Sequence, residues 1–359
     1  MSVISIPDLQ SAVDEVVKSA WDAGLSIVDS PEKLAMVRQI PNLAVKLQGL
    51  EDSAILASIS RVRQGASGAD RPVKEVEFEA LSEAKDELGS DVPDGDFFAR
   101  ALPAAVWNAP WMSAIERVVL VYRLREVVAQ VGFTRFEAAG PDIQGDLSLD
   151  VKRAPLALDS SWLPAVENRG EGIFLQLRAD SVNAWLQRPA VQQRGIQLAD
   201  GFQRWKAEHE GSSREFPGLP YYMLHSLAHL LLTAISLECG YPASSLRERI
   251  FAAPDAYGIL IYTGSSDAEG TLGGLVVAAR DIRRHMRRAL ESGALCSNDP
   301  VCANHAPARH DHQHLHGSAC HGCLLIAETS CEQRNEFLDR ALVVPTIEAL
   351  KAEFFAPIS

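Results

Sequence analysis

The sequence predicts an α+β fold that is mostly helical and contains a small mixed sheet. Helical periodicity dominates the first hundred residues, whereas apolar runs rich in β-branched residues predict strands further along the chain. Five of the six cysteines fall between Cys296 and Cys331, which predicts a metal-binding region. We therefore expect an acidic, mainly helical region at 1–110, a mixed α/β region at 111–200 and a zinc-binding domain at 201–359.

Length and charge limit the classes of function. A chain of 359 residues is long enough for two or three domains, each with its own core. The net charge is −13, and residues 1–150 hold 24 acidic and 14 basic side chains. A chain with this net negative charge is not expected to bind nucleic acid by itself. Contact with DNA would need a local basic face or a basic partner.

No segment has the pattern of a signal peptide or a membrane span. The N-terminal sequence MSVISIPDLQSAVDE has neither a basic stretch nor an apolar stretch. The longest apolar run, 227–237, is interrupted by polar residues and falls short of a span. We expect a cytoplasmic protein that does not engage a membrane.

In the first region, apolar residues at helical spacing predict helices near Val13–Trp21 and over Glu32–Gln39. Gly65–Pro72 has the composition of a loop. Charged and apolar residues alternate over Glu75–Ala80, which predicts a short strand.

The middle region combines one expected helix with several strands. Apolar residues over 111–131 predict a helix, with Gly132 as its C-cap. Strands are expected at 147–151, 162–166 and 172–177. The charged, glycine-containing segment 167–172 reads as an exposed turn between the last two, in preference to a catalytic pair of glutamates.

The third region begins with two expected helices, 192–210 and 221–240. The second is apolar nearly all round and belongs in a core. It carries His225 and His229 at i and i+4, but the glutamate of the metalloprotease pattern H-E-x-x-H is replaced by Ser226. We interpret the pair as core histidines, with a metal role as the alternative.

A buried strand is expected at 257–263, followed by a glycine-rich turn and a helix over 275–293. The turn matches no phosphate-binding motif, and the chain contains no Gly-Lys dipeptide and hence no Walker A sequence. The helix gathers five arginines on one face, which either contacts phosphate or a partner or is a solvated face neutralised elsewhere: Arg280, Arg283, Arg284, Arg287 and Arg288.

The clustered cysteines favour a structural zinc site. Cys320 and Cys323 form a knuckle whose two-residue spacer lets both thiolates reach one ion. A redox pair would need a thioredoxin-like context, and a catalytic zinc usually keeps an open position. We expect four thiolate ligands, with Cys296 as a competing fourth ligand or a bystander: Cys302, Cys320, Cys323 and Cys331.

Between Cys302 and Cys320 lies a histidine-rich loop that we expect to be solvated. Alternating histidines can bind metal weakly. His305 and His321 are the nearest candidates to replace one thiolate.

Several segments resemble the helicase-associated zinc-binding domain MZB and, more specifically, the DrmB proteins of the DISARM anti-phage system. They are HSLAHLLL (225–232), ERIFAAPDAYGILIYTGSSDAEGTLGGLV (248–276), CSNDPVC (296–302), CHGCLL (320–325) and ETSCEQRNEFLDR (328–340). Two segments upstream, RLREVVAQVGFTR (123–135) and LPAVENRGEGIFL (163–175), resemble DrmB as well. The family's usual N-terminal region with its own cysteines has no match here, so another polypeptide supplies it or the chain is a shortened relative.

The resemblance implies a structural Zn²⁺ held by the clustered cysteines and no catalytic residue of the chain's own. It implies an accessory subunit that forms a heterodimer with a DrmA-like superfamily 2 helicase and reaches DNA through that complex. Asn335, Asp339 and Arg340 match a family tail that is expected to brace the zinc module. The alternative from another class is a zinc-dependent nuclease or hydrolase that uses His225, His229 or the loop histidines.

Overall fold

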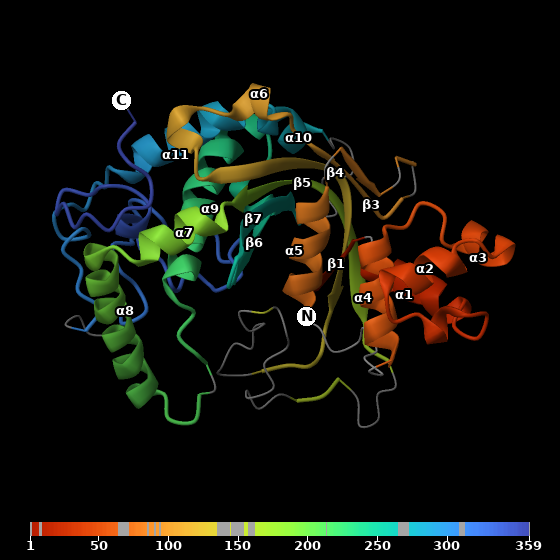
Figure 1. Cartoon of the computed structure of the whole chain (residues 1–359). Coiled ribbons are helices and arrows are strands. Elements are labelled where there is room, and N and C mark those ends of the chain that lie inside the picture. Colours follow the sequence, from red (N-terminus) through yellow and green to blue (C-terminus); the bar gives the residue numbers. More distant parts are fainter. Residues whose placement is uncertain are drawn as a thin grey trace. The chain divides into compact units, whose positions relative to one another are not determined.

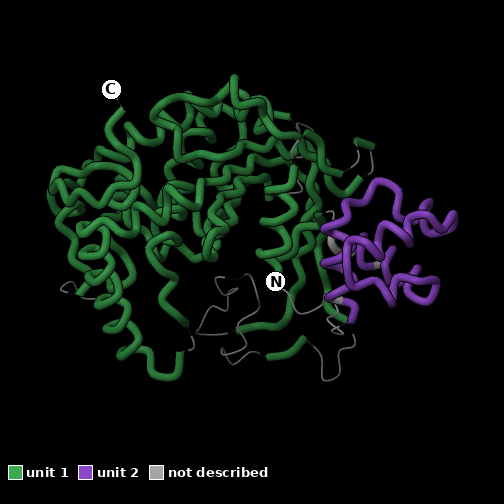
Figure 2. Tube along the Cα trace, viewed as in Figure 1, with its two compact units in different colours: residues 1–6, 73–359 green, residues 7–72 purple. Residues whose placement is uncertain are grey.

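The computed structural model describes most of the chain, in two compact units. Residues 7–72 form one unit, and residues 1–6 with 73–359 form the other (Figure 2). The boundaries expected at residues 110 and 200 both fall inside the larger unit. The described residues are 2–6, 9–63, 72–84, 86–89, 91–92, 95–134, 144, 154–156, 162–212, 214–264, 273–308 and 313–358.

The smaller unit is a bundle of short helices. Its elements are α1 (Leu9–Ser19), the 3₁₀ helix η1 (Leu25–Ile27), α2 (Pro31–Val37), α3 (Pro41–Lys46) and α4 (Asp52–Arg63). Ser30 caps α2 by accepting the backbone N–H of Lys33, with Pro31 at the first helical position. Val17, Leu34 and other aliphatic side chains fill its core. Both helices predicted in this stretch are confirmed.

The larger unit is built on a seven-stranded sheet (Figure 1). Its strands are β1 (Ser2–Ser5), β2 (Glu87–Gly89), β3 (Phe97–Ala101), β4 (Ile115–Ala129), β5 (Ala165–Leu177), β6 (Leu246–Ala253) and β7 (Ala256–Thr263). The order is β2-β3-β4-β5-β7-β6, and β1 pairs with the end of β4. All pairings among the described residues are antiparallel. The predicted α+β class is confirmed.

Both faces of the sheet are covered by helices. Along β4, Val118 and Leu120 face one apolar core while Val119 and Val121 face the other, as strand periodicity requires. The larger core includes the long helix α9 (Leu219–Cys239), and α5 (Val73–Glu83) contributes to the opposite one. The remaining helical elements are α6 (Ala104–Trp107), η3 (Pro110–Met112), α7 (Ala179–Leu186), α8 (Pro189–Glu208), η4 (Ala243–Ser245), α10 (Gly274–Ala279), α11 (Ile282–Gly293) and η6 (Arg340–Leu342).

The helices expected at 192–210 and 221–240 are confirmed as α8 and α9, and the strand at 257–263 as β7. The helix expected over 275–293 is divided into α10 and α11 near Asp281. The strand expected at 147–151 lies outside the described residues, as does most of the loop at 65–72.

The helix expected over 111–131 is wrong, because most of this segment is strand β4. Both faces of the strand are buried, so its apolar residues run on continuously instead of alternating. Periodicity alone cannot distinguish such a run from a buried helix. The β-branched residues Val118, Val119 and Val121 were the signal that favoured a strand.

The strand expected at 75–80 is also wrong, because these residues belong to α5. Phe78 and Leu81, one turn apart, pack in the core shared with the sheet. Glu77 on the same helix is 2% exposed, pairs with Arg249 and accepts the backbone N–H of Ile4. The alternation of charged and apolar residues was misleading because one of the glutamates points inward.

The turn expected at 167–172 is part of the continuous strand β5. Gly170 and Gly172 allow the neighbouring strand to approach closely: a Cβ on Gly170 would lie 2.3 Å from Thr263 Oγ1. Glu171 between them is 1% exposed, contrary to the expected surface position. Glycine here marks a close approach of two strands and not a turn.

One helix among the described residues, α9, has the length and hydropathy of a membrane span. Its apolar window is 72% buried inside the fold, as in the core helix of a water-soluble domain.

Candidate metal centre

The C-terminal segment, residues 294–358, contains η6 as its only helix or strand among the described residues. It consists of turns that pack against α9, α11 and the sheet. Such a segment cannot be stabilised by long ladders of backbone hydrogen bonds, so its side chains must fix its path. Two groups of metal-ligating side chains involve this segment: one lies wholly within it, and the other includes one of its cysteines.

The first group, here the four-cysteine cluster, joins two loops. Its sulfur atoms lie within 4.8 Å of one another and belong to Cys296, Cys302, Cys320 and Cys323. The Sγ–Sγ distances are 3.4 Å for Cys296–Cys320 and 3.7 Å for both Cys302–Cys323 and Cys320–Cys323. The edge of a tetrahedron of sulfurs around zinc is about 3.8 Å, from Zn–S bonds of about 2.3 Å. A disulfide would bring two sulfurs to about 2 Å, so this spacing suits a shared ion.

Nearby N–H groups point at the sulfurs of this cluster. Asn298 donates its backbone N–H to Cys296 Sγ at 3.4 Å and its side-chain N–H to Cys320 Sγ at 3.3 Å. Gly322 donates to Cys320 Sγ at 3.3 Å. A Cβ on Gly322 would lie 2.6 Å from the hydroxyl of the exposed Ser297, which would have to rotate away, so glycine leaves the knuckle uncrowded. These donors stabilise thiolates, the form that binds metal.

The electrostatics of the four-cysteine cluster also fit a cation. The hydrogen bond with Cys323 and burial raise the pKa of Cys302 far above that of an ordinary thiol. Burial raises the pKa of Cys296 to about 11. Four thiols this close cannot all ionise unless a positive charge lies among them. Zn²⁺ provides that charge and accepts four thiolates in a closed tetrahedral site.

Arg340 contacts the loop that carries Cys296 and Cys302. Its side chain is completely buried and donates to the carbonyl oxygens of Gly293 and Ala294 at 3.1 and 3.3 Å. It also pairs with Asp299, which accepts the backbone N–H of Ala303 at 3.1 Å. The guanidinium group therefore fixes the loop that carries Cys296 and Cys302.

Asp339 and Asn335 brace the other turns of the segment, as the resemblance implied. The carboxylate of Asp339 accepts hydrogen bonds from Arg194 Nε at 2.6 Å and from the backbone N–H of Ser318 at 2.9 Å. Asn335 makes two hydrogen bonds with the backbone of Ile326, at 2.9 and 3.0 Å.

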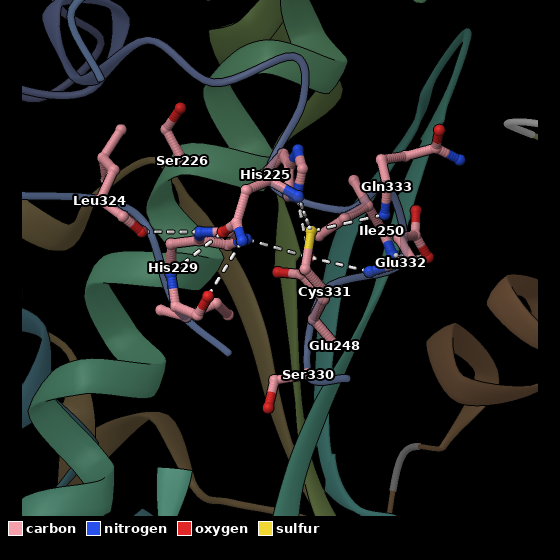
Figure 3. Close-up of polar contacts among 12 residues, drawn as sticks. His225, Ser226, His229, Glu248, Ile250, Leu324, Ser330, Cys331, Glu332 and Gln333 are labelled. Carbon is pink, nitrogen blue, oxygen red and sulfur yellow. Dashed lines mark hydrogen bonds and ion pairs between the residues drawn. The ribbon is translucent and has the colours of Figure 1, made fainter. Parts of the chain in front are cut away.

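The structure does not bring Cys331 to the four-cysteine cluster, and Cys296 takes the place expected for it. Cys331 lies on the turn after residue 330 and belongs to a second group, here the His–Glu–Cys cluster (Figure 3). The members of that cluster are His225, His229, Glu248 and Cys331. The seven residues between Cys323 and Cys331 carry the chain away from the knuckle to α9.

The His–Glu–Cys cluster is strongly charged in the absence of metal. Burial by itself lowers the pKa of His229, but Glu248 and Cys331 together raise that pKa to about 9. The pKa of His225 is likewise raised, against burial, by Glu248 and Cys331. Burial raises the pKa of Cys331, but His225 and His229 together outweigh it and the net shift of this pKa is downward. The sequence analysis missed Glu248, which lies between Arg247 and Arg249 in β6 and so gave no local sign that it is buried.

The described histidines of the 302–320 loop are more ordered than expected. His305 and His314 are buried, with ring nitrogens 3.1 and 2.8 Å from the carbonyl oxygens of Gln313 and Pro307. Neither joins a metal-ligating group, and the exposed His321 does not either. The expectation of a solvated loop is wrong for these residues, while His310 and His312 lie outside the described part of the chain.

The five arginines flanking and within α11 are all exposed. Arg284 and Arg288 both pair with Glu238 of α9, and Arg284 also pairs with Asp281. Arg287 lies over the ring of Trp111, 5.7 Å from its centroid. The acidic residues that offset this face thus come from α9 and from the start of α11.

The N-terminal end of α10 is occupied by a carboxylate of the chain itself. Glu171 accepts the backbone N–H groups of Leu275 and Val276 at 2.8 and 3.3 Å, and the hydroxyl of Tyr241 at 2.8 Å. These are the N–H groups that a bound phosphate would use. The connection itself, residues 265–272, lies outside the described residues, so its interpretation as a tight strand-to-helix turn stays a prediction.

Comparison with known proteins agrees with this geometry. Residues 227–324 match the family model of MZB, the MrfA Zn-binding domain, and this range contains the whole four-cysteine cluster. The DISARM protein DrmB of Bacillus paralicheniformis is 35% identical over 290 residues, which cover 79% of this chain. The chain spans about half the length of that protein, 49%. The resemblance found in the sequence is confirmed: the chain is similar to DISARM DrmB over most of its length, and residues 227–324 match the MZB zinc-binding domain.

Proposed function

We propose that the chain is a non-catalytic, zinc-stabilised accessory subunit of a DISARM-type anti-phage system in the cytoplasm. In this role it forms a heterodimer with a DrmA-like superfamily 2 helicase and helps that helicase to bind DNA. The similarity to DrmB supports the system to which it belongs. The four-cysteine cluster supports the absence of catalysis, because four thiolates fill a tetrahedral zinc site and leave no position for water.

The surface we propose for the partner or for DNA is the arginine face of α11. Two arginines at its N-terminal end, Arg280 and Arg283, have no carboxylate partner among the described residues. The five guanidinium groups exceed the three nearby acidic residues, Asp281, Glu238 and Glu291, so the face keeps a positive charge on an acidic chain. Guanidinium groups bind phosphate in a bidentate manner, which suits a surface that follows a nucleic-acid backbone.

The test is co-purification of this chain with the product of the neighbouring helicase gene, followed by DNA binding of the complex. We expect a stable complex that binds DNA more tightly than the helicase alone. Arg280→Glu with Arg283→Glu should weaken complex formation or DNA binding by tenfold or more, and the DNA affinity should become less sensitive to salt. Arg204→Glu, an exposed arginine on α8, is the matched control. A chain that never co-purifies would contradict the proposal.

A zinc-dependent nuclease or hydrolase is the alternative, and the position of its histidines disfavours it. His225 and His229 are 0% exposed, and their ring nitrogens are engaged by protein atoms. We expect no DNA cleavage with Mg²⁺, Mn²⁺ or Zn²⁺ added. Cleavage that is lost in His229→Ala, but retained in His314→Ala, would replace the accessory role with the enzymatic one.

A further inference from the structure

The His–Glu–Cys cluster draws its four side chains from three separate parts of the fold. His225 and His229 lie one turn apart on α9, Glu248 lies on β6, and Cys331 lies in the C-terminal segment (Figure 3). Their ligand atoms are within 4.8 Å of one another. The exposed fractions are 0%, 0%, 3% and 8%, so solvent water does not separate these groups.

The histidine tautomers are set by the backbone. His225 Nδ1 lies 3.3 Å from the carbonyl oxygen of Phe337, and His229 Nδ1 lies 2.8 Å from that of Leu324. A carbonyl can only accept, so each Nδ1 carries the proton. In a neutral ring the lone pair is then on Nε2. Metal-bound histidines are commonly oriented in this way, by a hydrogen bond from the other ring nitrogen to a carbonyl.

Both Nε2 atoms point at anionic groups. His225 Nε2 is 2.8 Å from Glu248 Oε1 and 3.1 Å from Cys331 Sγ. His229 Nε2 is 3.2 Å from the same carboxylate oxygen. Two neutral imidazoles would direct their lone pairs at a carboxylate and a thiolate, which is repulsive. A metal-free cluster relieves this repulsion only with added protons, on the rings or on the thiol and carboxyl groups, whereas a cation among the four atoms relieves it without them.

The backbone around Cys331 prepares its sulfur as an anion. Gln333 and Asn335 donate their N–H groups to Cys331 Sγ at 3.4 and 3.0 Å. Three residues near Cys331 have a left-handed backbone conformation, which is costly for residues other than glycine. They are Arg334, Asn335 and Phe337, with φ angles of 53°, 63° and 61°. Successive turns of this kind aim N–H groups at one centre.

Glu248 supplies a further indication. Its second oxygen, Oε2, is buried and has no hydrogen-bond partner among the described residues. A buried unpaired carboxylate oxygen is rare and costly in a native fold. A carboxylate that ligates a metal has less need of such a partner, because the cation takes up its negative charge.

In its fully ionised form, the metal-free alternative holds two imidazolium rings, a carboxylate and a thiolate, all removed from water; in a less ionised form, one proton on the Glu248 oxygen must serve the two Nε2 atoms that lie 2.8 and 3.2 Å from it. Desolvating four charges costs several kcal/mol per ion, to be recovered by their mutual attraction. One divalent cation neutralises the carboxylate and the thiolate while both rings stay neutral. Tetrahedral zinc with such ligands has edges of about 3.3–3.8 Å, slightly longer than the distances of 2.8–3.2 Å here. Small rotations of the side chains would accommodate the ion.

We propose that His225, His229, Glu248 and Cys331 form a second metal centre, distinct from the four-cysteine cluster. The mixture of two imidazoles, one carboxylate and one thiolate suits Zn²⁺. All four ligands come from the protein and are buried, so the centre is structural. It fastens the C-terminal segment to α9 and β6, while the four-cysteine cluster ties two loops of that segment together. This inference goes beyond the accessory role and holds or fails independently of it.

The decisive measurement is metal content and zinc K-edge absorption of the full chain, purified without chelators. We expect two zinc ions per chain, with five sulfur ligands and three nitrogen or oxygen ligands shared between them. This measurement uses the wild-type protein and does not depend on a variant that folds. One zinc ion with a purely sulfur shell would overturn the second centre and leave the four-cysteine cluster intact.

Two variants assign the second ion. His229→Gln and Cys331→Ser should each reduce the content to one zinc, and the remaining ion should have sulfur ligands only. His314→Gln is the matched control, because His314 is a buried histidine whose ring also contacts a backbone carbonyl but that lies outside both clusters. It should keep two ions. Retention of two ions in folded His229→Gln would also overturn the proposal.

Discussion

The four-cysteine cluster and the His–Glu–Cys cluster differ in how far apart the sequence places their members. The first joins two loops between Cys296 and Cys323, and three of its four cysteines are only partly buried. The second joins residues as many as 106 positions apart and is buried throughout. Closing a longer loop costs more chain entropy, so the second cluster can assemble only where α9 and β6 have already packed. The first cluster therefore organises a local segment, and the second reports whether the whole larger unit has folded.

The largest effect should follow removal of a ligand from the four-cysteine cluster. Cys323→Ser should abolish zinc binding there and leave the C-terminal segment insoluble or sensitive to protease. Apparent zinc binding energies of about 10–16 kcal/mol match or exceed the roughly 5–15 kcal/mol of a whole domain. Zinc content and limited proteolysis measure the effect. Cys239→Ser, outside both clusters, is the control, and an unchanged Cys323→Ser would show that the ligand is wrongly assigned.

A smaller effect is expected when the buried Arg340, which holds the loop of the four-cysteine cluster, is removed while all four cysteines are kept. Arg340→Met leaves Asp299 and two carbonyl groups without their buried partner. Breaking a buried ion pair costs about 3–5 kcal/mol, measured by urea unfolding. Zinc should exchange faster from the four-cysteine cluster than in the wild type. Equal acceleration at both clusters would mean that they are not separate.

A pH-dependent part of the stability should come from His316, which is a member of neither cluster. Burial lowers the pKa of His316 to about 4, whereas the pKa in the unfolded state is near 6.5. On acidification the imidazole is therefore protonated at a lower pH in the folded state than in the unfolded state. This contribution to stability is complete above pH 6.5 and is lost as the pH falls towards 4, at about 2–3 kcal/mol. His316→Gln should lose less stability than the wild type over that interval in pH-dependent urea unfolding. Parallel curves for the two proteins would refute the assignment.

The smallest effect should come from crowding the knuckle. Gly322→Ala places a methyl group 2.6 Å from Ser297 Oγ and 3.4 Å from Cys296 Sγ. Overpacking of this kind costs about 1–3 kcal/mol and should appear as weaker zinc binding in competition with a chelating dye. Only one of the two ions should be affected. Gly211→Ala, outside both clusters and with no atom within 4 Å, should keep its zinc affinity even though the positive φ of 90° strains an alanine there.

The features that could be predicted from the sequence are those formed by residues close together in the chain, and the features that were missed join residues far apart. The CxxC knuckle, the buried helix α9 and the arginine face of α11 depend on residues a few positions apart, and all were found. Strand β4 was taken for a helix because its partners on both faces come from elsewhere in the chain. Glu248 and Cys331 could not be joined to His225 and His229 by spacing. Only the packing of β6 and the C-terminal segment against α9 brings them together.

The position of β1 has a practical consequence for shortening the chain. Ser2–Ser5 pair with β4, Ile4 donates to Glu77 on α5, and Arg249 on β6 contacts Ser2 and Glu77. The helical unit 7–72 is thus inserted between two parts of one fold. Replacing residues 7–72 by a short linker keeps that edge of the sheet paired. Truncation up to residue 72 would strip the edge strand as well and leave the backbone of β4 open to pairing with another chain.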